Sequence, residues 1–227
     1  DNKMGSEDRG PIIINGKPIK SINQFYNKKR AEIQMVICGD KPACAELSIN
    51  GKRTSKELVK ITDWRNEKIL DYMHKTSRFV INHCLEHNLG HIVIGKNDGW
   101  KQEINIGKRN NQNFVSIPFD KLIQQIQYKA QLVGIKVTKV CENYTSKCSA
   151  LDLEVIGKHE NHAYAGKRVK RGLFRTALGL LINADVNGAL NILRKVIGDN
   201  FLKPFIQKVV PLKRDSGYLC YPFKVCF

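Results

Sequence analysis

Four segments of the chain place apolar residues three or four positions apart, which is the spacing of one face of an α-helix. Ser21, Thr54 and Asn183 stand where N-caps are expected, and Thr54 precedes Glu57 by three positions, as in a capping box. The pattern therefore predicts helices over residues 21–38, 54–88, 118–133 and 183–197. Glycines beyond these segments, expected at helix ends, are found at 39, 90, 134 and 198.

Short apolar runs between these helices predict strands. The III run at 12–14 precedes Asn15-Gly16, a pair that favours a two-residue hairpin turn. Residues 91–94 indicate a buried strand, and residues 135–140 alternate like a second one. Since a predicted helix separates the last two strands, they should form a parallel βαβ pair. The sequence thus predicts an α/β fold.

Four other segments lack such patterns. Residues 40–53 and 95–117 are polar and predict loops, the second carrying the basic pair Lys108-Arg109. Residues 143–182 are irregular and basic. Residues 201–227 mix proline, lysine and aromatic residues, and they indicate an ill-packed tail.

Charge points to a polyanionic partner. The 227 residues include 38 Lys+Arg against 21 Asp+Glu, a formal net charge of +17, which favours nucleic acid over an unspecialised basic protein. A hydrophobic content of 42% excludes a wholly disordered tail. Apolar runs stay below the ~18 residues that would predict a membrane span, and the seven scattered cysteines indicate a reducing compartment.

Two acids occupy positions where catalytic carboxylates are expected. Glu142 follows the strand at 135–140, and sites in open α/β sheets gather beyond the carboxyl ends of strands. Asp185 lies in the first turn of the last predicted helix. Together they suggest a Mg²⁺ site, although a solvated strand-end acid and a helix-dipole acid explain them separately. A two-metal nuclease needs at least one more acid.

The segment 158–175 is rich in basic residues, with Tyr164 and Phe174 interleaved. Basic side chains neutralise phosphates and aromatic rings stack on bases, so contact with nucleic acid is a better interpretation than a solvated loop. The basic residues are Lys158, Lys167, Arg168, Lys170, Arg171 and Arg175.

Zinc ligands are poorly represented. The chain has no C-x₂-C pair, and Cys148, His159 and His162 do not have a standard zinc spacing. The sequence therefore does not predict a structural zinc ion.

Several stretches resemble the C-terminal half of transposon-encoded TnpB proteins, the OrfB proteins of insertion sequences, which are relatives of the type V CRISPR effectors. They are CENYTSKC at 141–148, YAGKRVKRGLFRT at 164–176 and LINADVNGALNILRK at 181–195, with support from 12–34 and 92–119. The resemblance implies an RNase H-like (RuvC) nuclease domain that cuts target DNA under the direction of a guide RNA. It also implies Mg²⁺, or Mn²⁺ in its place, held by three acids.

The resemblance assigns two of these three acids. Asp185 in NADVNGALNI matches the last one. The middle acid of the family normally ends a strand at the position occupied here by Gly95, and Glu142 in ENYTSK matches a relocated position used in some branches. The first acid belongs to a strand expected before Asp1, so we expect a RuvC fold incomplete at the N-terminus and a chain that does not cleave DNA by itself.

The four-cysteine zinc ribbon of the family is reduced here to Cys148, and a basic insertion takes its place. The expected division is a RuvC-like core at 1–147, the basic insertion at 148–182, the last RuvC helix at 183–200 and a tail at 201–227.

Three functions are compatible with this sequence. The first is the RuvC-like part of a transposon-associated, RNA-guided DNA endonuclease, acting in the prokaryotic cytoplasm and associated with the nucleoid through DNA. The alternatives are a nuclease-dead relative that represses by binding RNA and DNA, and a non-catalytic RNA-binding protein. No membrane partner is expected, and no feature specifies an oligomeric state.

Overall fold

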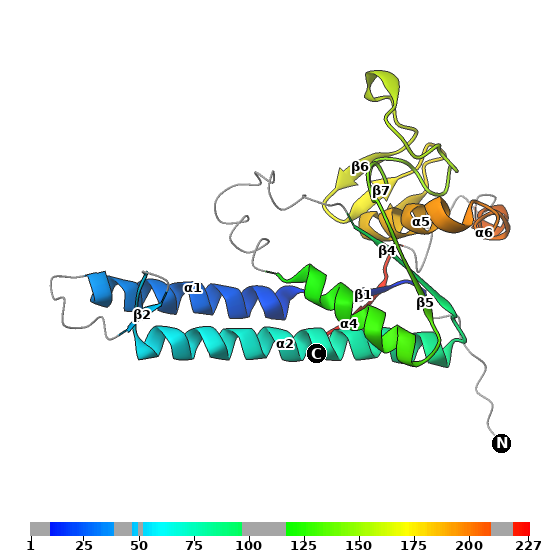
Figure 1. Ribbon diagram of the computed structural model, residues 1–227. Helices are drawn as coiled ribbons and strands as arrows, with labels where there is room; N and C mark the ends of the chain where they lie inside the picture. Colours follow the sequence, from blue (N-terminus) through cyan, green and yellow to red (C-terminus); the bar gives the residue numbers. More distant parts are fainter. Residues whose placement is uncertain (1–9, 39–46, 50–51, 97–116, 210–219) are drawn as a thin grey trace. The chain divides into compact units, whose positions relative to one another are not determined.

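The computed structural model describes residues 10–38, 47–49, 52–96, 117–209 and 220–227 (Figure 1). Their mixture of helices and strands confirms the predicted α/β content, whereas an RNase H-like topology stays a prediction. These residues divide into two compact units, each described by itself. The helix unit comprises 15–38, 47–49, 52–88, 117–134 and 226–227; the strand unit comprises 10–14, 89–96, 135–209 and 220–225.

The helix unit is built on three helices, α1 (Lys17–Cys38), α2 (Lys56–Glu86) and α4 (Phe119–Leu132). Helix α2 packs against both α1 and α4, and α1 and α2 lie side by side in Figure 1. A short hairpin of β2 (Leu47–Ile49) and β3 (Lys52–Thr54) precedes α2. The buried apolar side chains of the helix unit include Ile69, Met73 and Ile81 on α2 and Ile126 and Ala130 on α4.

The start of α1 corrects the predicted hairpin turn at Asn15-Gly16. The Asn15 Oδ1 atom accepts a hydrogen bond from the Lys17 backbone N–H at 3.1 Å, and the helix begins there rather than after Ser21. Pro18 is tolerated because a first-turn residue needs no backbone N–H donor. The turn prediction failed because an Asn side chain that accepts from the backbone suits a helix start as well as a turn.

The ends of α2 also differ from the sequence prediction. Ser55 rather than Thr54 is the N-cap, and its Oγ accepts from the Leu58 N–H at 3.2 Å. Thr54 instead ends β3, so part of the predicted 40–53 loop is a strand pair. At the other end Asn88, not Gly90, adopts the left-handed conformation, with φ 54°.

Lys129 on α4 is buried against α2, with a residue exposure of 5%. Its ammonium donates to the Ser77 Oγ at 2.6 Å and to the His74 carbonyl at 3.0 Å. Burial lowers the pKa of Lys129, and the nearby positive charge of Arg78 lowers it further. A cation held by uncharged acceptors retains much of its desolvation cost.

We therefore expect Lys129→Met to stabilise the protein by about 1 kcal/mol. Since the unfolded state binds this proton more tightly, wild-type stability should rise as pH climbs through the folded pKa toward 10.5. The advantage of the variant should shrink over the same interval. Thermal denaturation against pH measures both effects, with the exposed Lys121→Met on the same helix as control. A destabilised Lys129→Met would show that the ammonium contributes net binding energy.

The strand unit contains the predicted parallel pair. Strands β4 (His91–Gly95) and β5 (Lys136–Val140) are parallel, with Gly95 opposite Val140, and α4 connects them in the chain. This confirms the predicted strand–helix–strand order. Strand β4 is half-buried rather than buried. Gly134, just before β5, has φ 75°, a conformation that glycine adopts without strain.

Part of the predicted irregular region forms regular secondary structure next to α5 (Ala184–Ile197). Strands β6 (Lys167–Lys170), β7 (Leu173–Arg175) and β8 (Leu181–Asn183) form one antiparallel sheet, preceded by the short 3-10 helix η2 (Glu160–His162). Gly172, with φ 78°, joins β6 to β7. The buried core beneath this sheet consists of Leu151, Phe174, Leu180, Ile182, Ala184 and Val186.

The prediction of an ill-packed C-terminal tail is wrong for the described residues. Helix α6 (Lys203–Val209) follows the buried Leu202, and β9 (Phe223–Val225) pairs in parallel with β1 (Ile12–Ile14). The partner strands are more than 200 residues apart in the chain, so no local pattern could reveal them. The four-part division of the chain stays a prediction. Among the described helices, none is long and apolar enough to cross a membrane.

Candidate functional site

Helix α5 presents Asp185 at its first turn. As predicted, Asn183 caps this helix: its Oδ1 accepts from the backbone N–H groups of Asp185 at 2.9 Å and Val186 at 3.3 Å. The Asp185 side chain is exposed. An acid at this position is stabilised by the helix dipole whether or not it binds a ligand.

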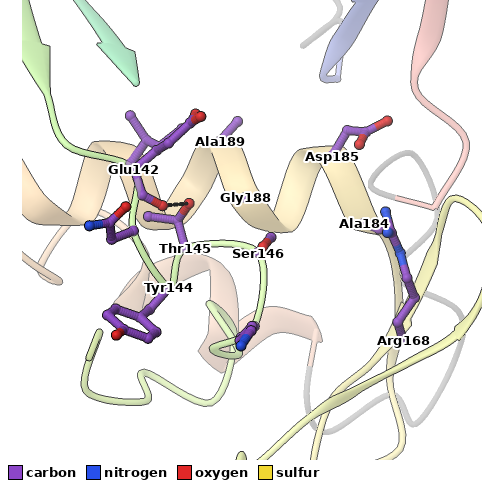
Figure 2. A pocket seen from close by; sticks show the side chains of 12 residues that line it. Glu142, Tyr144, Thr145, Ser146, Arg168, Ala184, Asp185, Gly188 and Ala189 are labelled. Carbon is purple, nitrogen blue, oxygen red and sulfur yellow. Dashed lines mark hydrogen bonds between the residues drawn. The ribbon is translucent and has the colours of Figure 1, made fainter. Parts of the chain in front are cut away.

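One stripe of α5 lines a pocket of about 660 Å³ (Figure 2). Asp185, Gly188, Ala189 and Ile192 have the spacing i, i+3, i+4 and i+7, so they share a face of the helix. Gly188 and Ala189 are small and leave the space above the helix open. The remaining lining residues are Glu142, Asn143, Tyr144, Thr145, Ser146, Lys147, Arg168 and Ala184.

Glu142 enters this pocket beside the end of β4. A Cβ atom added to Gly95 would lie 2.9 Å from the Glu142 Oε2 and 2.5 Å from the Ile192 Cδ1. The Ile192 side chain and the Glu142 carboxylate therefore together occupy the space that a side chain at Gly95 would need. Because β4 and β5 are paired in parallel, their carboxyl ends meet here, and an acid following β5 reaches the end of β4.

The loop that carries Glu142 is attached to α5 by its backbone. Lys195 donates to the carbonyls on either side of Glu142, at 2.9 Å to Cys141 and 2.8 Å to Asn143. The Thr145 hydroxyl donates to the Glu142 carbonyl at 2.7 Å. The helix that carries Asp185 thus also positions Glu142.

Two fully buried asparagines of α5 extend this attachment. Asn187 accepts from the Ala150 N–H and donates to the Cys148 carbonyl, both at 2.9 Å. Asn191 donates to the same carbonyl at 2.7 Å and to the Thr145 carbonyl at 2.9 Å. Asn191 thus donates both of its amide hydrogens to the loop, and Asn187 donates one hydrogen and accepts one, so the amides specify the loop's path.

Arg194 completes the network. Its Nη1 donates to the Asn191 Oδ1 at 2.8 Å, and its Nε donates to the Asp199 Oδ1 at 2.7 Å. This hydrogen bond lowers the pKa of Asp199. The Arg194 side chain is 4% exposed, so it depends on both acceptors.

The predicted basic residues of 158–175 are all exposed, as phosphate contacts require. In the β6–β7 hairpin Lys167 is paired with Arg175 and Arg168 with the buried Phe174. Directly paired residues point to the same face, so Arg168 lies on the core side and lines the pocket of Glu142 and Asp185. Lys108 and Arg109 lie outside the described residues.

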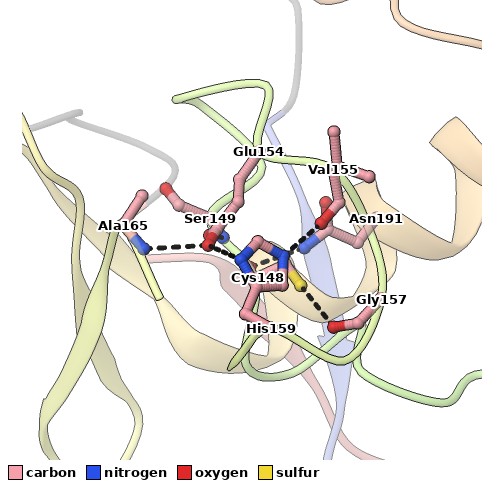
Figure 3. Close-up of polar contacts among 8 residues, drawn as sticks. All are labelled: Cys148, Ser149, Glu154, Val155, Gly157, His159, Ala165 and Asn191. Carbon is pink, nitrogen blue, oxygen red and sulfur yellow. Dashed lines mark hydrogen bonds and ion pairs between the residues drawn. The ribbon is translucent and has the colours of Figure 1, made fainter. Parts of the chain in front are cut away.

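Cys148, Glu154 and His159 come together beside this hairpin (Figure 3). Their potential ligand atoms all lie within 4.8 Å of one another. Cys148 is fully buried and donates from Sγ to the Gly157 carbonyl at 3.8 Å, and burial raises the pKa of this thiol. Of the three residues considered from the sequence, Cys148 and His159 are therefore adjacent, while the His162 side chain lies outside the described part of the chain.

The Glu154 carboxylate binds two backbone N–H groups that lie far apart in the chain. Its Oε2 accepts from the Ser149 N–H at 2.6 Å and its Oε1 from the Ala165 N–H at 2.8 Å. The His159 Nδ1 lies 3.6 Å from the same Oε1. These hydrogen bonds link the backbone at Ser149 to the backbone at Ala165. The absence of structural zinc stays a prediction.

Comparison with known proteins finds one matching family model and several similar proteins. The family model described as "Cas12f1-like, TNB domain" matches residues 119–192. The TnpB-like protein ORF457 of Acidianus two-tailed virus is 29% identical over 195 residues, covering 82% of this chain and 37% of that protein. The chain is thus similar to TnpB-like proteins and, through further matches, to Cas12f proteins.

Two further matches are to Cas12f1 proteins. The CRISPR-associated endodeoxyribonuclease Cas12f1 of Sulfoacidibacillus thermotolerans is 31% identical over 52% of this chain and 25% of its own length. The solved structure "Cryo-EM structure of the Cas12f1-sgRNA-target DNA complex" matches 74% of this chain and 40% of that one, with 18% identity and a TM-score of 0.48, too low to establish the fold. This chain spans 37% of the length of ORF457 and 25% of the length of Cas12f1.

Sequence reasoning missed several residues of the TnpB-like site. Lys195, Asn187 and Asn191 position the Glu142 loop, and they belong to the NADVNGALNILRK stretch that carries the resemblance. These residues are four positions apart and so lie on one face of α5. The sequence could have revealed them by this spacing, because polar residues on an otherwise apolar helix face need hydrogen-bond partners. Glu154 had no such signal, since its partners are backbone groups.

Proposed function

We propose that this chain forms the RuvC-like part of an RNA-guided DNA endonuclease, with Glu142 and Asp185 as its metal-binding acids. The observation that carries the proposal is that both acids line one pocket while the Glu142 carboxylate fills the space beside Gly95. In the family resemblance, Gly95 occupies the usual position of the middle acid. An acid relocated to residue 142 thus reaches the same strand end.

The donor set suits a hard divalent cation. Both candidates are carboxylates, the ligands Mg²⁺ and Mn²⁺ favour, and the open pocket leaves room for water and substrate oxygens. When bound, such an ion would stabilise negative charge on a phosphodiester undergoing hydrolysis. The third acid that the family resemblance implies is proposed to come from a strand before Asp1.

The protein groups around the acids suit a phosphate backbone. Arg168 and Lys147 line the same pocket and are exposed, so they can bind the phosphates flanking a scissile bond. Lys195 donates to backbone carbonyls beside Glu142 and so orients that acid rather than the substrate. In this proposal α5 holds both acids in fixed relation while the β6–β7 hairpin orients the nucleic acid.

The proposed partners are a guide RNA and target DNA in a prokaryotic cytoplasm. The relative Cas12f1 is named as an endodeoxyribonuclease, and the net charge of +17 suits binding of a polyanion. Phosphate contacts by the hairpin would position either strand without reading its sequence.

Metal binding by the two acids tests the proposal directly. We expect Mn²⁺, followed by electron paramagnetic resonance of the purified chain, to bind roughly tenfold or more weakly to Glu142→Gln and to Asp185→Asn. Gly95→Ala should also weaken binding, because its Cβ would meet both the Ile192 side chain and the Glu142 carboxylate and force them to shift.

Glu160→Gln, which removes an exposed acid of η2, serves as the control and should bind Mn²⁺ like the wild type. Equal Mn²⁺ affinity in all four variants would show that the pocket does not hold the ion. Circular dichroism of each variant excludes unfolding as the cause of a loss.

A further inference from the structure

The C-terminal end of α2 carries a second group of metal-ligand side chains. His83, Glu86 and His87 have the spacing i, i+3 and i+4, so they lie on one face of the helix. Each offers a ligand atom within 4.8 Å of the other two. The two imidazole rings are close, with centroids 4.3 Å apart.

The separation of these ligand atoms is only slightly larger than that of the ligands around a bound metal ion. Bonds of about 2.0–2.2 Å from a metal to imidazole nitrogen or carboxylate oxygen place tetrahedral ligand atoms about 3.4 Å apart. Small side-chain rotations therefore bring all three donors onto one ion. Glu86 and His87 are exposed, so such rotations meet little resistance.

Two features of the helix end favour a cation there. Helix α2 ends at Glu86 with His87 as its C-cap, and carbonyl groups at a helix C-terminus attract positive charge. The His83 ring is stacked on Phe79, with centroids 6.2 Å apart and planes at 14°. Phe79 in turn contacts Phe227 edge-on at 5.6 Å. The stacked ring gives one ligand a defined orientation before the ion arrives.

We propose that His83, Glu86 and His87 form a binding site for a divalent transition-metal ion such as Zn²⁺, Co²⁺ or Ni²⁺. Two imidazoles and one carboxylate select these ions over Mg²⁺, which prefers oxygen ligands. Three protein ligands leave at least one coordination position for water or an outside ligand. The site belongs to the helix unit and is independent of the Glu142 pocket, so it does not rest on the proposed function.

Titration with Co²⁺ alone tests the site in the full chain purified without a histidine tag. Visible d–d absorption reports coordination, and a thiolate–cobalt charge-transfer band in the near ultraviolet separately reports any binding at Cys148. We expect the His159→Asn variant, which removes the imidazole of the Cys148 cluster, to keep a Co²⁺ site free of the thiolate band. Adding His87→Asn to it should weaken that site roughly tenfold or more.

The matched control is His74→Asn in the same background, because His74 lies on α2 but outside the cluster. It should bind Co²⁺ like its parent. Glu86→Gln provides a second, exposed substitution that cannot perturb the core, and it should also weaken binding. Co²⁺ affinity unchanged by both His87→Asn and Glu86→Gln, or no d–d band from the His159→Asn chain, would overturn the proposal.

Discussion

Replacing Lys167, Arg168, Lys170 and Arg171 together with glutamine should lower the affinity for nucleic acid by up to about a thousandfold at 0.1 M salt. Each phosphate contact adds roughly 0.9 to the log–log dependence of duplex DNA affinity on salt. If all four side chains contact phosphates, the slope should fall by about 3.6. Binding of duplex DNA and of RNA, measured over a series of salt concentrations, gives both quantities.

The geometry of the β6–β7 hairpin is the reason for so large an effect. All four residues of β6 are exposed, and the hairpin rests on the buried Phe174. Gly166 packs beneath that ring, since an added Cβ would lie 2.3 Å from the Phe174 Cε1. The basic side chains are thus carried by an ordered sheet, and less conformational entropy is lost when they bind.

A charge-matched variant in the helix unit separates this effect from the loss of net charge. Lys28, Arg30, Lys60 and Lys68 are exposed on α1 and α2, and their replacement by glutamine removes the same charge. The hairpin variant should lose far more affinity than this control, by similar factors across DNA sequences. An unchanged salt slope in the hairpin variant would refute the phosphate contacts. Binding abolished by chelator rather than salt would instead indicate a metal-held segment around Cys148.

Replacing Asn191 with alanine should lower the free energy of unfolding by about 2–4 kcal/mol. The amide donates to two backbone carbonyls and accepts from Arg194, and it is fully buried. Alanine leaves these groups without partners and creates a cavity under the Glu142 loop. Denaturation by urea measures the loss in stability.

The substitution should also weaken Mn²⁺ binding under conditions where the variant is folded, because the loop carrying Glu142 loses its attachment to α5. Asn200→Ala, at an exposed turn after α5, is the matched control and should change stability by less than about 0.5 kcal/mol. An Asn191→Ala chain as stable as wild type would mean that the carbonyls find other donors.

Helix α5 shows how far local signals reach. Its N-cap Asn183, its first-turn Asp185 and its terminal Gly198 were all predicted, and all three stand at those positions. Capping depends on residues within one turn of each other, so sequence neighbours contain the information. The parallel pairing of β4 and β5 was predictable for a similar reason, because a strand–helix–strand order is the usual connection of a parallel pair.

The start of α1 and the end of the chain show where local signals fail. Asn15-Gly16 is compatible with a hairpin turn and with a helix start, and the choice follows from β1 pairing with β9 instead of an adjacent strand. That pairing depends on residues 223–225, which resemble an unstructured tail when read alone. Contacts at such separations are decided by burial and hydrogen bonding in the folded chain.

The sequence by itself determined the charge, the helix ends of α5, the order of strand, helix and strand, and the two acids with their family resemblance. Only the tertiary structure decided that Glu142 occupies the space beside Gly95, that Asn187, Asn191 and Lys195 hold its loop, and that Arg168 lines the same pocket. The reason is physical. Composition and capping act within a few residues, whereas a site is assembled from strand ends, a helix face and a hairpin that meet only when the chain buries its core.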